Sequence, residues 1–211
     1  MKYPLDRRRQ PVIVGVTSAE PARGSEKDRW KAMIIAVAGR RIDAADAQSA
    51  RFPLRNVALV QQRLDELFSR EAATGLVSSG ACGADLVALT VAGTRHMRRR
   101  MVLPFGRNEF RESSVIDRPG DWGPVYDRLL AELDTTGDVV TLAGHAAGDA
   151  AYVAANDAIL HEAATLARQG TTDVLVVLVW EGAPRDGADM TAAFGDEARK
   201  RGFRVEQVKT L

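Results

Sequence analysis

Largely apolar runs alternate along this chain with segments in which apolar residues recur every three or four positions. The runs cover residues 33–38, 75–79, 101–105, 139–142, 174–180 and 205–208. Such runs are typical of strands that are covered on both faces. The segments 54–70, 122–133, 150–168 and 191–201 have the spacing of amphipathic or buried helices. The pattern therefore predicts strands and helices in alternation.

This alternation predicts an α/β fold, a doubly wound and mostly parallel sheet with helices on both faces in three α/β/α layers. In such folds ligands bind where the carboxyl ends of the strands meet. The 211 residues suffice for one domain of this kind. We assign it to residues 31–211. Residues 1–30 are interpreted as an N-terminal extension with a short strand at 12–16 and a linker at 19–29.

Amino-acid composition limits the cellular compartment and the binding partners that we expect for this chain. Lys and Arg number 29 against 28 Asp and Glu, so the net charge of +1 gives no general attraction to nucleic acid or to an acidic membrane. The single cysteine, Cys82, excludes an internal disulfide and fits a reducing compartment. No apolar stretch reaches the roughly 18 residues of a membrane span, and the first residues do not resemble a signal peptide. We therefore expect a cytoplasmic protein without a membrane partner.

The segment that follows the run at 75–79 is the most informative part of the chain. It reads Ser79, Gly80, Ala81, Cys82, Gly83, Ala84 and Asp85 before apolar residues resume. Small side chains between a strand and a helix let a ligand approach the backbone, and the first amides of the helix favour an anion. The segment predicts a phosphate site, although a plain tight turn would use the same residues.

The ends of the other predicted strands are also polar or small. They supply Gly39, Arg40 and Arg41, then Pro104 and Phe105 followed by Arg111, Ser113 and Ser114, and finally Trp180, Glu181 and Gly182 followed by Gly187, Asp189 and Thr191. The predicted fold places all of these at one rim of the sheet. Helix N-termini, arginines and aromatic rings on one rim suit a nucleotide, with phosphate on amides and guanidinium groups and the base on a ring.

Four of these positions allow a second interpretation. Arg40 and Arg41 also fit a solvated strand end, and Trp180 also fits the core. Cys82 near a helix N-terminus fits either a reactive thiol or a small buried residue. Asn156 lies on the apolar stripe of its helix, so its amide binds a ligand or holds a loop in place.

Other polar clusters give weaker indications. The histidines at 96, 145 and 161 lack metal-ligand spacing, so no metal site is expected. The basic run 95–100 would bind single-stranded DNA if exposed, but without interleaved aromatic residues a solvated helix end is favoured and nucleic acid is an unlikely partner. Carboxylates at 109, 112, 117 and 121 could act on a glycosidic bond or belong to a polar loop.

These motifs together resemble the SLOG superfamily, Rossmann-like nucleotide-binding domains related to DNA-processing protein A and to the cytokinin-activating phosphoribohydrolases. The resemblance covers about residues 31–211. It rests on Gly39, on the segment 79–85, on Leu-Pro-Phe at 103–105 with the residues 110–115, and on 180–182 with Asp189 and Thr191. It implies a nucleotide pocket at the rim, with no further cofactor required.

The resemblance also bears on catalysis. The phosphoribohydrolases carry a glutamate near the start of the last helix, where this chain has Phe194. We therefore expect a sensor-type domain that binds a nucleotide or a nucleotide-derived molecule without turnover, and that signals by assembling with itself or a partner. The alternative is a nucleotide N-glycosidase in which Glu112 or Glu181 replaces the missing carboxylate.

Overall fold

The computed structural model describes residues 32–144 and 147–211, which contain a six-stranded sheet in the order β4-β3-β2-β1-β5-β6. The strands are β1 (Met33–Gly39), β2 (Ala73–Ser78), β3 (Arg98–Leu103), β4 (Val139–Thr141), β5 (Asp173–Trp180) and β6 (Arg204–Lys209). Every pairing is parallel, so the sheet is wholly rather than mostly parallel. The doubly wound α/β fold is confirmed. The strand and linker predicted within 1–30 lie outside the described residues.

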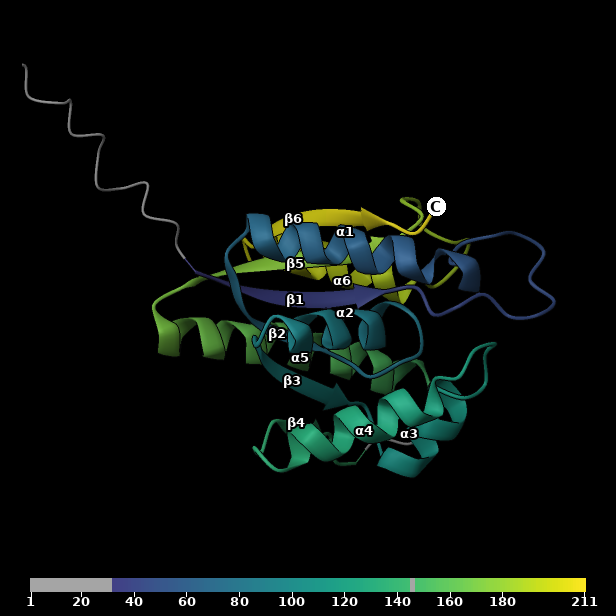
Figure 1. Cartoon of the computed structure of the whole chain (residues 1–211), viewed down its shortest axis with the longest axis horizontal. Helices are drawn as coiled ribbons and strands as arrows, with labels where there is room; N and C mark the ends of the chain where they lie inside the picture. The colour runs from purple at the N-terminus through teal and green to yellow at the C-terminus, as the bar shows by residue number, and fades with distance from the viewer. Residues whose placement is uncertain (1–31, 145–146) are drawn as a thin grey trace, which may run out of the picture.

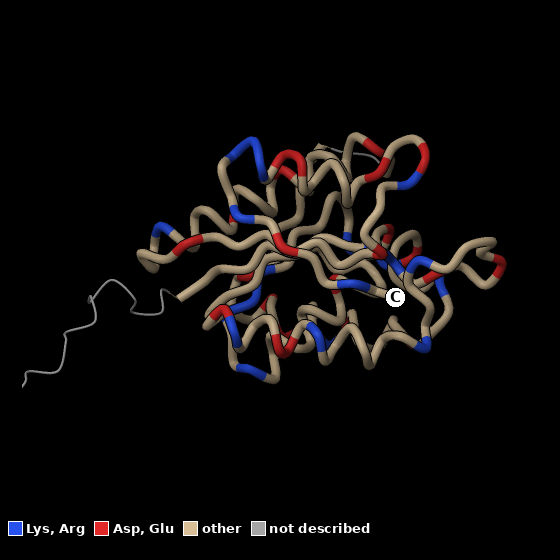
Figure 2. The backbone as a smooth tube through the Cα atoms, turned by 90° about the horizontal axis from the view of Figure 1, so that it is seen from above, with Lys and Arg blue, Asp and Glu red and all other residues tan. Residues whose placement is uncertain are grey.

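The helices cover both faces of this sheet (Figure 1). They are α1 (Val57–Arg70), preceded by the short turn η2 (Leu54–Asn56), α2 (Ala84–Thr94), α3 (Arg107–Ser114), α4 (Gly123–Asp134), α5 (Asp149–Gly170) and α6 (Met190–Lys200). In Figure 1, α1 and α2 lie in front of the sheet and α5 and α6 lie behind it. Figure 2 shows the sheet edge-on between the two helix layers, with acidic and basic residues interspersed over both.

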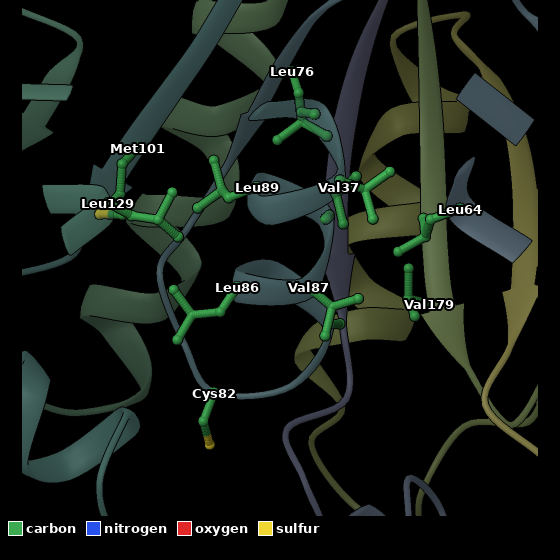
Figure 3. Packing of buried hydrophobic residues seen from close by; sticks show 14 of the residues in the cluster. Val37, Leu64, Leu76, Cys82, Leu86, Val87, Leu89, Met101, Leu129 and Val179 are labelled. Carbon is green, nitrogen blue, oxygen red and sulfur yellow. The ribbon is translucent and has the colours of Figure 1, made fainter. Parts of the chain in front are cut away.

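A separate apolar core fills each side of the sheet. One core packs α1, α2 and α4 onto side chains such as Val37, Leu76 and Met101, and Figure 3 shows these beside Leu86 and Leu89 of α2. The other packs α5 and α6 onto the opposite face through residues that include Ile159 and Phe194. Burial on both faces explains why the strands are continuous apolar runs.

The strand order reverses beside β1. The chain adds β2, β3 and β4 on one side of β1 and then returns to place β5 on the other side. The register pairs Gly39 at the end of β1 with Val179, one residue before the end of β5. The carboxyl ends of all the strands face the right-hand side of Figure 1. Such a reversal point is where open α/β sheets form ligand crevices.

The segment after β3 is helical where the sequence also allowed a polar loop. Residues Arg107–Ser114 form α3, whose buried positions Phe110 and Ser114 lie one helical turn apart. The Phe110 ring packs edge-on against Phe105 at a centroid distance of 5.8 Å. Two buried positions in eight residues form a stripe too short for periodicity alone to identify, so the helix depends on packing against its neighbours.

Gly39 sits where β1, β5 and α2 approach one another most closely. An added Cβ would lie 2.4 Å from the Val179 carbonyl oxygen and 2.5 Å from the Cβ of Ala84. Both neighbours belong to the rigid sheet and helix, so neither can move aside cheaply. The absence of a side chain at this position allows the end of β1 to lie against the start of α2.

Gly39→Ala is expected to lower the free energy of unfolding by about 1–3 kcal/mol, because the new methyl group overpacks this junction. Urea denaturation followed by circular dichroism measures the loss. Gly106→Ala is the matched control, since its Cβ would meet no atom within 4 Å and its φ of −53° suits alanine. Equal stability of the two variants would contradict the prediction.

Candidate functional site

A cavity of about 560 Å³ opens at the carboxyl ends of β1 and β2. Its walls come from the end of β1 and the segment after it, the loop before α2, the α3 region, the first half of α5 and the start of α6. Nine predicted site residues line it, namely Gly39, Arg40, Arg41, Ser79, Ala81, Asp85, Ser114, Asn156 and Thr191. The structure thus brings together residues from distant parts of the chain, as the strand-end argument predicted.

Arg40 forms one side of the cavity and is buried by ion pairs. Its Nε atom donates to Glu181 at 2.6 Å and its Nη1 atom to Asp189 at 2.8 Å, while Nη2 also donates to the carbonyl oxygen of Ala183. Burial alone would raise the pKa of Glu181, but hydrogen bonds from Arg40 keep it below its ordinary value. Glu181 also accepts a hydrogen bond from Arg51 at 2.9 Å. The cluster joins the segment after β1 to the segment after β5.

The amides of the helix start predicted near Gly187 to Thr191 are occupied by a side chain. Asp189 caps α6 and accepts hydrogen bonds from the amides of Thr191, Ala192 and Arg185 at 2.9, 3.1 and 2.7 Å. A carboxylate thus takes amides that could otherwise bind an anion at this helix N-terminus. These amides are therefore already paired within the protein.

Several backbone amides of the loop before α2 also donate hydrogen bonds to other groups of the protein. Ala84 donates to the Arg40 carbonyl oxygen at 3.1 Å, and Cys82 donates to the Ser114 carbonyl oxygen at 3.0 Å. Gly83 adopts a φ of +94°, and an added Cβ would lie 2.8 Å from the Arg40 carbonyl oxygen. The absence of a side chain at Gly83 therefore allows this loop to lie close to the segment after β1. Ser79 and Ala81 remain in the cavity lining.

The mouth of the cavity carries a second arginine cluster. Arg41 donates through Nη1 to both carboxylate oxygens of Asp117, at 2.9 and 2.8 Å, and to the carbonyl oxygen of Ser113. Arg118 donates to the same carboxylate at 3.2 Å. Both guanidinium groups are partly exposed and line the cavity. Two positive charges therefore share one carboxylate here.

Residues of α3 and α5 also line the cavity. The Tyr152 hydroxyl and the Ser114 hydroxyl lie 3.0 Å apart, and the Tyr152 ring packs edge-on against Phe105. Asn156 donates to the carbonyl oxygen of Met190 at 3.0 Å, so it holds the start of α6 while also lining the cavity. These residues offer an aromatic ring, two hydroxyl groups and an amide.

Asp85 is the buried carboxyl group of the cavity. It lies in the first turn of α2 with 7% of its surface exposed. Burial raises its pKa to about 7, although the Ala81 amide and the positive charge of Arg41 act in the opposite direction. Asp85 therefore changes its charge near neutral pH, unlike an exposed aspartate.

Cys82 is fully buried and belongs to the same apolar cluster as Leu86 and Val87 of α2, and Figure 3 shows it in the loop before that helix. Burial raises the pKa of its thiol to about 11. The thiol is therefore protonated at neutral pH and is a weak nucleophile. Of the two interpretations of Cys82, the structure favours the small buried residue.

Several predicted site residues lie outside the cavity lining. They are Gly80, Cys82, Gly83, Pro104, Phe105, Arg111, Ser113, Trp180, Gly182, Gly187 and Asp189, together with both catalytic candidates Glu112 and Glu181. Arg111 instead donates to both carboxylate oxygens of Asp127 on α4. Trp180 is buried, and its indole nitrogen donates to Gln207 of β6. Glu112 is exposed on α3 beside Arg111.

The largest omission of the sequence analysis is the segment after β1. Residues Ile42, Asp43, Ala44, Ala47, Gln48, Ser49 and Arg51 also line the cavity. Asp43 closes this segment by accepting hydrogen bonds from the amides of Arg51 and Phe52. The position of strand ends in the predicted fold pointed to this region, but nothing in its composition indicated that so many of its residues line the cavity.

The basic run 95–100 is paired with carboxylates instead of forming a free patch. Arg98 and Arg100 belong to β3 and contact Asp138, at 3.1 and 2.7 Å. Arg99 contacts Glu132 and Arg95 contacts Asp65. Within the described residues, no group of His, Cys, Asp and Glu side chains is arranged to hold a metal ion. In that same part of the chain, none of the helices combines the length and apolar character needed to cross a bilayer.

Comparisons with known proteins add a distant similarity of fold. No protein-family model matches the chain, and no curated protein matches it. Solved structures that align with it include DNA processing protein A from Streptococcus pneumoniae, with 15% sequence identity over 84% of this chain and a TM-score of 0.39. Moco carrier protein from Chlamydomonas reinhardtii aligns with 11% identity over 85% of this chain and a TM-score of 0.32. Streptococcus suis SuiB bound to S-adenosylmethionine aligns with 9% identity over 84% of this chain and a TM-score of 0.27.

The aligned regions cover different shares of the three structures, namely 59%, 91% and 47% of their chains in the same order. This chain therefore spans less than two thirds of DNA processing protein A. The resemblance to the SLOG superfamily rests on the sequence motifs. What is established is a Rossmann-like, wholly parallel α/β fold with a cavity at its strand-end rim.

Proposed function

We propose that the chain binds a nucleotide or a nucleotide-derived molecule in the rim cavity, as a sensor-type domain without turnover. The cavity itself carries the proposal. Its volume of about 560 Å³ lies within the usual range of small-molecule sites, roughly 300–1,000 Å³. It lies beside the reversal point of a doubly wound sheet, where such ligands commonly bind.

The arginine clusters supply the phosphate end of this site. Arg41 and Arg118 share the single carboxylate of Asp117, which leaves one positive charge at the mouth uncompensated within that cluster. A guanidinium group can present two parallel donors to phosphate oxygens. We therefore place the phosphate at Arg41 and Arg118 rather than at the α6 N-terminus, whose amides bind Asp189.

Apolar and aromatic side chains of the cavity lining suit the sugar and the base. Phe110, Ile159 and Met190 supply apolar surface, and Tyr152 adds an aromatic ring with a polar tip. Such side chains can cover one face of a base while hydroxyl and amide groups contact the ribose. The cavity thus offers both guanidinium groups and apolar surface, the two kinds of contact that a nucleotide needs.

The positions of the carboxylates support binding without turnover. An N-glycosidase needs a carboxylate directed at the ribose. Glu112 has 69% of its side chain exposed on the outer side of α3, and Glu181 is engaged by both Arg40 and Arg51. Neither lines the cavity. The carboxylates named for the enzyme hypothesis are therefore poorly placed for that reaction.

Arg41→Gln is expected to weaken the binding of nucleoside monophosphates by about ten- to a hundredfold, because charge-assisted hydrogen bonds contribute roughly 1.5–3 kcal/mol. Isothermal titration calorimetry with AMP, GMP, CMP and UMP measures the change. Arg111→Gln is the matched control, an arginine ion-paired to Asp127 outside the cavity lining. Failure of all four nucleotides to bind the wild-type protein would overturn the proposed function.

Incubation of the wild-type protein with the same four nucleotides is expected to release no free base, since neither Glu112 nor Glu181 lines the cavity. Chromatography of the reaction mixture over several hours checks this. Base release by wild type that Glu181→Gln abolishes, with nucleotide affinity retained, would establish the enzyme hypothesis instead. Glu112→Gln, on the exposed face of α3, is the control for that loss.

A further inference from the structure

We propose that Asp85 takes part in binding as a neutral acid, so that the cavity takes up a proton together with the anionic group of a nucleotide and loses affinity as the pH rises. This inference rests on the proposed function and adds to it a dependence of ligand affinity on pH. It concerns one residue of the cavity lining and its surroundings.

Asp85 differs in its partners from Asp189 and Glu181, the neighbouring carboxylates of the rim. Asp189 and Glu181 each contact Arg40, at 2.8 and 2.6 Å. Across the described residues, Asp85 has no lysine or arginine within 4 Å, although only 7% of its surface is exposed. A buried carboxylate without a cationic partner is costly, and protonation removes that cost.

The hydrogen bonds around Asp85 stabilise its ionised form only weakly. The Ala81 amide donates to it at 3.3 Å, which is long for a charge-assisted bond. The Ser78 hydroxyl, which also contacts the Val37 carbonyl oxygen at 3.2 Å, lowers the pKa of Asp85 as well. Burial outweighs these contacts and raises the pKa of Asp85 to about 7.

Titratable and charged side chains reach the cavity from each neighbouring element. They are Arg40, Arg41, Asp43 and Arg51 from the segment after β1, Arg118 from the segment after α3, Asp149 and Tyr152 from α5, and Arg185 from the segment before α6. Of these, Arg41 is the one whose charge favours the ionised form of Asp85. A phosphate bound to Arg41 would neutralise this charge and add negative charge to the same cavity.

The sign of the coupling follows from this arrangement. A bound anion disfavours ionised Asp85, so the pKa of Asp85 rises further in the complex. Nucleotide affinity is therefore highest below pH 7, where Asp85 is already protonated, and falls above pH 7, where binding must also recruit a proton. Each unit by which the pKa rises corresponds to about a tenfold loss of affinity at high pH.

The test compares wild type with Asp85→Asn, which keeps the shape of a neutral acid and cannot ionise. The affinity for the tightest binder among AMP, GMP, CMP and UMP is measured by calorimetry at pH 6.0, 7.0, 8.0 and 8.5. The ratio of the two affinities cancels the titration of the phosphate itself, whose second pKa is about 6. Asp121→Asn, an exposed carboxylate outside the cavity lining, is the matched control.

We expect the two proteins to bind equally at pH 6.0 and Asp85→Asn to bind about tenfold more tightly than wild type at pH 8.5. A ratio that does not change with pH would overturn the inference and leave the proposed function standing. Loss of binding in a folded Asp85→Asn protein would also overturn it, because Asp85 would then act as a carboxylate. If no nucleotide binds either protein at any pH, the proposed function fails and this inference fails with it.

A second measurement needs no variant. At pH 8.0 a nucleoside monophosphate is already almost fully ionised, so proton uptake on binding reports a group of the protein. Calorimetry of the wild-type protein in buffers of different ionisation enthalpy counts these protons. Uptake of a measurable fraction of a proton at pH 8.0 is expected, and no uptake would contradict the proposal even if Asp85→Asn did not fold.

Discussion

The buried side chain of Arg40 determines how the rim of this sheet is built. Arg40 follows β1 directly and meets Glu181, which follows β5, so the ion pair lies at the point where the strand order reverses. Asp189 binds the same guanidinium group and also caps α6. Because breaking a buried ion pair by removing one partner costs about 3–5 kcal/mol, the three charges hold β1, β5 and α6 in one arrangement.

This cluster shapes the rim of the sheet. In a doubly wound sheet the reversal point is the default crevice, and the N-terminus of the next helix is the default anion site. Here the cavity lies beside the reversal point and has Arg40 in its lining, while Asp189 takes the amides at the start of α6. The open space lies toward β2 and α5, where Arg41, Asp85 and Tyr152 face the cavity. Many proteins share this fold, but the arrangement of charged side chains at the rim is specific to this chain.

The strand ends were predictable because the fold requires them to meet. Gly39, Ser79 and Thr191 come from distant segments, and each lines the cavity as the parallel arrangement demands. Arg111 and Trp180 carried suitable chemistry but lie outside the cavity lining. Arg111 directly follows the buried Phe110 in α3, so its side chain is rotated about 100° around the helix and reaches Asp127, while Trp180 packs with the core beside α6. Sequence position alone does not reveal the direction in which such a side chain points.

Periodicity and apolar runs by themselves determined the layers, the order of elements and the edge of the sheet where the cavity lies. These features follow from short-range chemistry, since buried strands need continuous apolar runs and surface helices need one apolar face. Only the tertiary structure decided which carboxylate each arginine contacts, that α3 forms, and that Asp85 is buried with no cationic partner among the described residues. Those properties depend on contacts between segments far apart in the chain, where a small change in packing changes the charge state or partner of a side chain.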